Sequence, residues 1–222
     1  MQKRHFLSAL TLALLTSYAA TASAQEKFKI GLILPMTGPF ASTGKQIEAA
    51  ARLYMAQNGD TVGDKKVELI VKDDTSAPDV TKRIAQELVV NDKVNVLAGF
   101  GLTPLAMATA PLATQSKTPM VVMAAATSSI TQASPFVVRT SFTLPQASVA
   151  MADWAPNNGI KKVVTLVSDY GPGIDAEKFF KDRMLFNGAQ VLDTLRVPMR
   201  NPDFAPFLQK VRDLKPDALF VF

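Results

Sequence analysis

The chain has 222 residues, a formal net charge of +5 at pH 7, no cysteine and one histidine, His5. Disulfides and thiolate metal sites are therefore excluded. The Lys and Arg residues are scattered, whereas nucleic-acid binding usually needs a basic stripe on one element, so we expect no nucleic acid partner.

The first 24 residues differ in composition from the rest of the chain. Lys3 and Arg4 precede an apolar stretch over 6–20, and Ala22-Ser23-Ala24 offers a small-residue cleavage site. The pattern predicts a signal peptide, residues 1–24, and a periplasmic location. A membrane anchor is the less favoured alternative, because roughly 20 apolar residues are needed to cross a bilayer. Cleavage would remove two basic residues and His5, leaving a charge of +3 and excluding Ser-His-Asp catalysis.

From residue 27 onward, short β-branched runs alternate with helical stretches, a pattern typical of βαβ units and a parallel sheet. The buried strands that we expect are 28–34, 67–72, 94–98 and 120–123. The first intervening helix places Ile47 and Tyr54 on one apolar face. The second is expected to be capped by Ser76, and the third to open at Thr103-Pro104.

At 134–145 the regular alternation of strand and helix is interrupted, and a second α/β series follows. The expected elements are a short strand at 136–139, a helix from Pro145 to about residue 158, strand 162–168, helix 174–187, strand 191–197, helix 202–215 capped by Asn201, and strand 218–222. We predict an α/β fold of two doubly wound parallel-sheet lobes, residues 25–140 and 141–222. A covering helix normally follows a parallel strand, so we expect the second lobe to be incomplete.

The segment from Gly99 to Pro104 admits two interpretations. It resembles the start of a dinucleotide-binding fingerprint, but Pro104 replaces the third glycine and no acidic residue lies about 20 positions further on. Alternatively, Thr103 caps the third helix, whose amides at Leu105 and Ala106 would face a small carboxylate. Thr103 could equally be a helix cap without any ligand.

Two further loops follow expected strands. The first runs from Ala124 to Ser129 and is rich in alanine and hydroxyl residues, and the second runs from Ser168 to Gly173. Loops at the carboxyl ends of parallel strands form the crevice where open α/β sheets bind ligands. Tyr170 would cover a ligand from the second lobe, unless these are ordinary loops.

Several segments resemble one protein family in sequence and order. The stretch Ile33–Gly44 resembles the first strand and loop of leucine/isoleucine/valine-type periplasmic binding proteins of ABC transporters, and 71–75, 98–103 and 168–171 agree with it. The resemblance implies the type I periplasmic-binding-protein fold, in which two lobes close on a ligand about a hinge. Because family members are considerably longer, we expect the chain to be truncated at its C-terminus.

The resemblance also implies a binding site, a partner and a function. The protein would capture a branched-chain or other amino acid, or an aromatic acid, for an inner-membrane ABC permease, with no cofactor and no catalysis. The residues at 41–46 and 100–104 are more similar to the branch of the family that binds aromatic acids. In the family, the carboxylate that binds the ammonium group of an amino acid would come from beyond Phe222. The implied substrate-binding residues are Thr43, Thr103, Ala125, Ala126, Thr127 and Tyr170.

Other functions remain open from the residues alone. The chain could be the ligand-sensing domain of a receptor or regulator, or an exported hydrolase that uses Asp73 and Asp74. Adjacent strand residues point to opposite faces, so these two carboxylates are poor partners for acid–base work. The binding-protein hypothesis requires Thr43, Thr103 and Thr127 to surround one cleft. We further expect residues 25–222 alone to bind weakly and to unfold easily.

Overall fold

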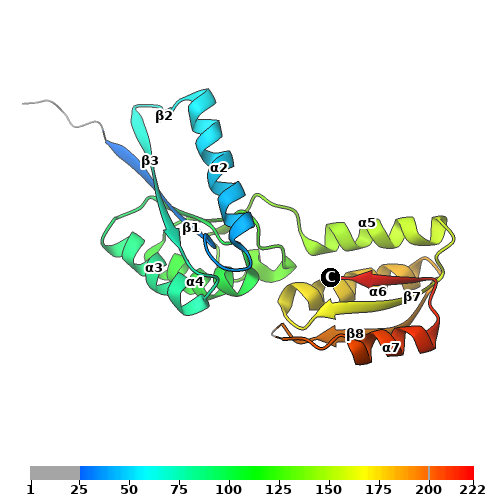
Figure 1. The fold of residues 1–222 in the computed structure, drawn as a ribbon. Helices are drawn as coiled ribbons and strands as arrows, with labels where there is room; N and C mark the ends of the chain where they lie inside the picture. Colours follow the sequence, from blue (N-terminus) through cyan, green and yellow to red (C-terminus); the bar gives the residue numbers. More distant parts are fainter. Residues whose placement is uncertain (1–25, 200) are drawn as a thin grey trace, which may run out of the picture.

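The computed structural model describes residues 26–199 and 201–222, so the expected signal peptide lies outside the described residues. Figure 1 shows two α/β lobes joined through the segment between β6 and α5. None of the described helices is both long enough and apolar enough to cross a membrane.

The first lobe is built on a six-stranded sheet with the order β2-β3-β1-β4-β5-β6. Short β2 is antiparallel to β3, and the other neighbours are parallel. Its elements are β1 (Lys27–Leu34), α2 (Ala41–Asn58), β2 (Thr61–Val62), β3 (Lys65–Asp73), α3 (Pro78–Val90), β4 (Val96–Gly99), α4 (Thr103–Ser116), β5 (Met120–Val122), η2 (Ser128–Gln132) and β6 (Val137–Arg139).

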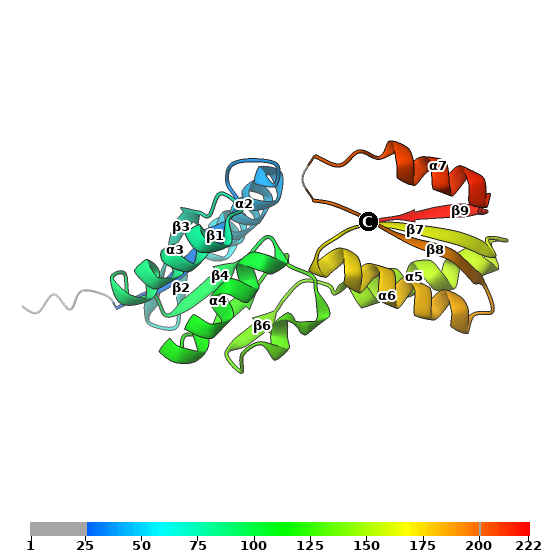
Figure 2. The same ribbon diagram turned by 90° about the horizontal axis from the view of Figure 1, so that it is seen from below.

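The second lobe has a three-stranded parallel sheet with the order β8-β7-β9. Its elements are α5 (Leu144–Asn157), β7 (Lys162–Ser168), α6 (Gly171–Phe186), β8 (Gln190–Val197), α7 (Ala205–Leu214) and β9 (Ala218–Val221). Figure 2 shows α5 and α6 on one face of this sheet and α7 on the other. Each predicted strand and helix is therefore present, with shifts at its ends.

Apolar side chains on both faces of the strands form the cores. In the first lobe the main core lies between the sheet and the helices α3 and α4, where Leu88, Leu97 and Met120 are fully buried. In the second lobe, Phe180 of α6 stacks on Phe220 of β9 with ring centroids 3.9 Å apart. Burial of such side chains is the main force that holds each sheet to its helices.

Two predicted helix caps are wrong, for one physical reason. The N-cap of α3 is Ala77, and Ser76 instead donates its backbone N–H to Asp74 Oδ1 at 2.9 Å. At α7, Asn201 is not the cap, and Asp203 Oδ1 accepts the N–H of Ala205 at 3.0 Å. In both places an aspartate closes a turn onto the backbone two residues later, which competes with ordinary capping.

Candidate ligand-binding site

Three strand ends of the first lobe are tied together by backbone hydrogen bonds. Phe100 donates its N–H to Ile33 O at 3.0 Å, and Ala125 donates to Phe100 O at 3.0 Å. Phe100 is fully buried with a φ of 64°, and Gly99 has a φ of 111°. A Cβ on Gly99 would lie 2.1 Å from Ile33 O, so only glycine fits. This strained turn fixes the loops after β4 and β5 relative to each other.

A pair of hydroxyl groups lies at the end of these loops. Thr103 Oγ1 and Thr127 Oγ1 are 2.8 Å apart, and both residues are more than nine-tenths buried, at 7% and 8% exposed. Because a hydroxyl group both donates and accepts, the pair retains further capacity to bond a carboxylate. Thr103 is the first residue of α4, not its cap, and the N-cap is Leu102.

The predicted role of the next amides is wrong. Leu105 and Ala106 both donate their N–H groups to Leu102 O at 3.2 Å. These donors are therefore used within the first turn of α4. A carboxylate at this helix end would depend on the Thr103 hydroxyl, while the positive end of the helix dipole still favours an anion.

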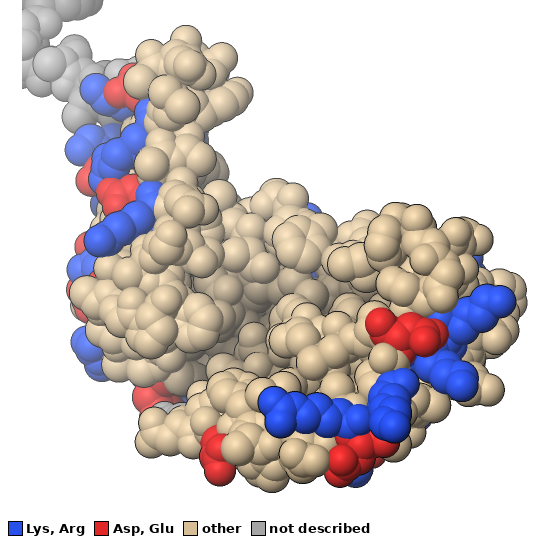
Figure 3. All heavy atoms as spheres, turned by 45° about the vertical axis from the view of Figure 1, so that its right-hand side comes forward, with Lys and Arg blue, Asp and Glu red and all other residues tan. Residues whose placement is uncertain are grey.

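Both lobes line one cavity beside the Thr103 hydroxyl, with a volume of ≈ 180 Å³. Figure 3 shows a recess between the lobes bordered mainly by residues other than Lys, Arg, Asp and Glu. The first lobe contributes the turn before α4 and the alanine loop, and the second contributes aromatic and proline side chains. The lining residues are Gly101, Leu102, Thr103, Ala124, Ala125, Ala126, Phe142, Leu144, Tyr170, Pro172 and Phe222.

Four of the six predicted site residues line this cavity, namely Thr103, Ala125, Ala126 and Tyr170. Thr127 is outside the lining, but it contacts the cavity wall through its bond to Thr103. Thr43 lies in the first turn of α2, half-buried, and does not line the cavity in the described part of the chain. The structure thus brings Thr103 and Thr127 together and leaves Thr43 outside the lining, so the requirement that all three threonines surround one cleft is not met.

Several lining residues were not predicted from the sequence, most notably Phe142, Leu144 and Phe222. Phe142 lies in the segment that connects the lobes, Leu144 begins α5, and Phe222 follows β9. Whether these residues reach the cavity depends on how the chain runs between the lobes, and the spacing of apolar residues in the sequence does not predict that. Phe222 faces Tyr170 with ring centroids 6.5 Å apart and an interplanar angle of 27°, and burial raises the pKa of the Tyr170 hydroxyl. An aromatic pair therefore covers one side of the cavity.

Asp73 and Asp74 have separate structural tasks. The carboxylate of Asp73 accepts hydrogen bonds from the N–H of Met36 and the hydroxyl of Thr37. Asp74 is fully buried, and desolvation raises the pKa of its carboxyl group. Both carboxylates also accept backbone N–H groups of the turn that follows, from Thr75 and Ser76 respectively, and these structural bonds give no support to the hydrolase alternative.

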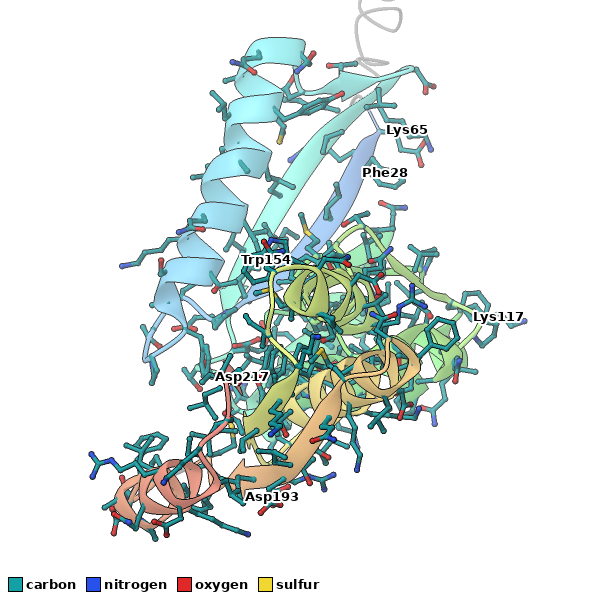
Figure 4. The ribbon with its side chains drawn as sticks, turned by 90° about the vertical axis from the view of Figure 1, so that its right-hand side faces the viewer. Phe28, Lys65, Lys117, Trp154, Asp193 and Asp217 are labelled. Atoms are coloured by element: carbon teal, nitrogen blue, oxygen red, sulfur yellow. The ribbon has the colours of Figure 1, made fainter. Side chains whose placement is uncertain are left out.

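A second hollow, of ≈ 200 Å³, lies within the second lobe and is lined by Met151, Trp154, Phe180 and Phe220 among others. It is bordered by α5, α6 and β9, and Trp154 is seen on α5 in Figure 4. Its lining shares no residue with the cavity between the lobes. The first lobe contributes none of its described lining, so of these two hollows it is the cavity at Thr103 that both lobes line.

The fold and the site define a two-lobed α/β binding protein whose lobes share one cavity. Residues 27–222 match the family described as periplasmic binding protein, and the chain belongs to this family. It is 46% identical over 215 residues to Leu/Ile/Val-binding protein homolog 6 of Brucella abortus, covering 96% of this chain and 55% of that protein. The chain thus spans about half the length of the curated relatives that it matches.

Solved structures agree with this assignment. A solute-binding protein from Rhodopseudomonas palustris BisB5, in complex with 3,4-dihydroxybenzoic acid, is 63% identical with a TM-score of 0.84, over 88% of this chain and 54% of that one. A second from R. palustris, in complex with 4-hydroxybenzoate, is 44% identical with a TM-score of 0.86, over 89% and 54%.

A leucine-binding protein from Thermotoga maritima is 30% identical with a TM-score of 0.77, over 87% of this chain and 55% of that one. The predicted family and fold class, the type I periplasmic-binding-protein fold, are confirmed by these comparisons.

Proposed function

We propose that this chain forms the ligand-capturing cleft of a solute-binding protein that delivers a small aromatic acid to an inner-membrane ABC permease. The observation that carries the proposal is the cavity that both lobes line, with the Thr103–Thr127 hydroxyl pair at one side and Tyr170 and Phe222 at the other. Export to the periplasm, directed by residues 1–24, belongs to the same proposal.

The lining suits a planar ring that carries one carboxylate. Ala125 and Ala126 provide a flat apolar wall, and the Tyr170 and Phe222 rings offer faces for offset stacking. Apolar cavities of about 150 Å³ accept a benzene ring, so ≈ 180 Å³ is adequate for a benzoate. The Thr103 hydroxyl, held by its bond to Thr127, and the positive end of α4 would hold the carboxylate.

The mechanism is a shift of the equilibrium between open and closed lobes. A ligand in this cavity contacts both lobes only when they are close together, so its binding energy favours the closed state. The permease would then recognise the closed protein. Binding and release leave the ligand chemically unchanged, so we expect no turnover.

Binding of a branched-chain amino acid is the second candidate. It is favoured by the name of the 46% identical relative and by the leucine-binding protein among the solved structures. An amino acid carries an ammonium group that needs a partner of its own, whereas an aromatic acid needs only the kind of apolar walls and hydroxyl groups that line the cavity here. The charge pattern of the ligand therefore separates the two candidates.

Isothermal titration calorimetry of the purified protein tests the proposal. The probes are 3,4-dihydroxybenzoate, 4-hydroxybenzoate, benzoate and L-leucine, with cyclohexanecarboxylate as a control that keeps the carboxylate and loses the planar ring. We expect micromolar binding of at least one benzoate and at least tenfold weaker binding of the control, a difference of about 1.4 kcal/mol. Binding of L-leucine alone would favour the second candidate, and heat from none of the probes would overturn both.

A further inference from the structure

One peptide group next to the candidate site is held at both ends by charged side chains. The carbonyl oxygen of Thr127 accepts a hydrogen bond from Arg139 Nη2 at 2.7 Å. The N–H of Ser128, on the other side of the same peptide bond, donates to Asp175 Oδ2 at 2.8 Å, and the Ser128 hydroxyl donates to Asp175 Oδ1 at 3.0 Å. We call this arrangement of Arg139, the Thr127–Ser128 peptide and Asp175 the peptide clamp.

The signs of the two charges match the dipole of the peptide group. A cation at the carbonyl oxygen and an anion at the N–H both stabilise this orientation, and hydrogen bonds to charged groups are about twice as strong as neutral ones. Burial lowers the pKa of Arg139, and the charge of Asp175 acts in the opposite direction. In the described part of the chain, Nε and Nη1 of Arg139 are buried without a hydrogen bond, so the nearby carboxylate is the main compensation for this cation.

The two charged residues come from different parts of the fold. Arg139 ends β6, where the chain leaves the first lobe, and Asp175 lies in the first turns of α6 in the second lobe. The same lobes touch beside the clamp, since a Cβ on Gly171 would lie 3.6 Å from both Thr103 Cγ2 and Thr127 Oγ1. The clamp therefore links the second lobe to the backbone that carries the Thr127 hydroxyl.

We propose that Arg139 and Asp175 are positioning residues that couple the approach of the lobes to the orientation of the Thr127 hydroxyl. This inference rests on the proposed function, because it gives that hydroxyl a role in ligand capture. When Asp175 accepts the Ser128 N–H, the Thr127 hydroxyl remains bonded to Thr103 and the second lobe remains in contact with the first. When the lobes move apart, the bond between Asp175 and Ser128 is lost, and the loop after β5 keeps only the hydrogen bond from Arg139.

The experiment compares Asp175→Ala with the control Asp182→Asn. Asp182 lies on the same helix and pairs with Lys178 at the surface, so this variant changes the charge of α6 and leaves the clamp intact. Asp175→Ala should weaken binding of 3,4-dihydroxybenzoate about tenfold, since hydrogen bonds to a charged acceptor contribute on this order. It should also increase the ligand-free radius of gyration in small-angle X-ray scattering, a change that a purely structural role would not produce. Asp182→Asn should leave both quantities unchanged.

Ser128→Ala tests the same link with a smaller change. It removes only the hydroxyl contact to Asp175 and keeps the backbone bond, so we expect a loss of affinity of about threefold. In the Asp175→Ala background the same substitution should have no further effect, because the shared contact is already lost. If Asp175→Ala fails to fold, Asp175→Asn replaces it, since the amide keeps one acceptor and loses the charge.

The outcomes separate this proposal from the proposed function. If the unmodified protein binds none of the probes, the proposed function fails, while the ligand-free radius of gyration of Asp175→Ala still tests the clamp. An unchanged radius together with an unchanged affinity would overturn the clamp and leave the proposed function intact. Additive effects of Ser128→Ala and Asp175→Ala would also overturn it.

Discussion

The hydroxyl of Thr103 has two possible tasks, to bond Thr127 and to bond a ligand. Thr103→Val keeps the shape of the side chain and removes the hydroxyl, which leaves Thr127 Oγ1 buried without its 2.8 Å partner. We expect the free energy of unfolding to fall by about 1–2 kcal/mol and the affinity for 3,4-dihydroxybenzoate to fall about tenfold. Urea unfolding and calorimetry measure the two effects.

Thr109→Val is the matched control for Thr103→Val. Thr109 is fully buried in the same helix, and its hydroxyl donates to Leu105 O at 3.0 Å, away from the cavity. This variant should lose about 1 kcal/mol of stability with no change in affinity. Equal losses of affinity in both variants would show that the effect at Thr103 is structural.

At the scale of single residues, the lining residues that directly follow a strand could be predicted from the sequence. The lining residues whose position depends on how the chain runs between the lobes could not. Thr103, Ala125 and Tyr170 stand at strand ends or in family motifs, so their approach to one cavity could be expected. Phe142 belongs to the connection between lobes, where no periodicity operates. The clamp residue Asp175 was missed because its partner, Ser128, lies 47 positions earlier.

At the scale of elements, two helices of the second lobe are joined by a polar cluster. The Asp153 carboxylate on α5 accepts hydrogen bonds from Arg183 on α6 and from Asn187 at its end. The hydrogen bonds from Arg183 and Asn187 lower the pKa of Asp153 below its ordinary value of 3.8. A carboxyl group whose pKa is lower in the folded state stabilises the fold above its unfolded pKa, and this contribution is lost as the pH falls through the folded value.

The comparison of wild type with Asp153→Asn should therefore depend on pH. We expect the wild type to be more stable at neutral pH, with a constant difference down to the ordinary pKa of 3.8 and a decreasing difference below it. Urea midpoints measured across this range give the difference. In an Arg183→Gln background the pH dependence should shrink, because the guanidinium whose hydrogen bond lowers the pKa of Asp153 most is removed. A difference that grows on acidification would contradict this assignment.

Element types were easier to predict than element ends. Apolar runs such as that of β7, which is buried on both faces, leave little alternative to a central parallel strand. Helix starts depend on single hydrogen bonds, and at α3 the residues Thr75 and Ser76 both adopt a positive φ that no propensity indicates. At α3 and α7, turns closed by an aspartate side chain precede the first residue of the helix. In the sequence, such a turn cannot be distinguished from an ordinary helix cap by residue types alone.

At the scale of the whole molecule, the proposed function requires two lobes that move as units. Each lobe has cores of its own, and the described contacts between the lobes include the hydrogen bonds of Asp175 to Ser128 and the residues around the cavity. The closing that the proposed function requires would be a hinge motion about the connection, with little change inside either lobe. The cavity and the clamp lie beside that connection, so small rotations there would move Tyr170 and Asp175 together relative to Thr103.

Trp154 can report whether the second lobe deforms when ligand binds. It is the only tryptophan in the chain, the residue is 55% exposed, and it lines the hollow within the second lobe. Addition of 3,4-dihydroxybenzoate should reduce the radius of gyration and leave the quenching of Trp154 fluorescence by acrylamide unchanged, because rigid closure does not alter its surroundings. Asp182→Asn should behave like the wild type in both measurements. A change in quenching without a change in radius would mean that the ligand reshapes the second lobe from within, and hinge closure would then have to be abandoned.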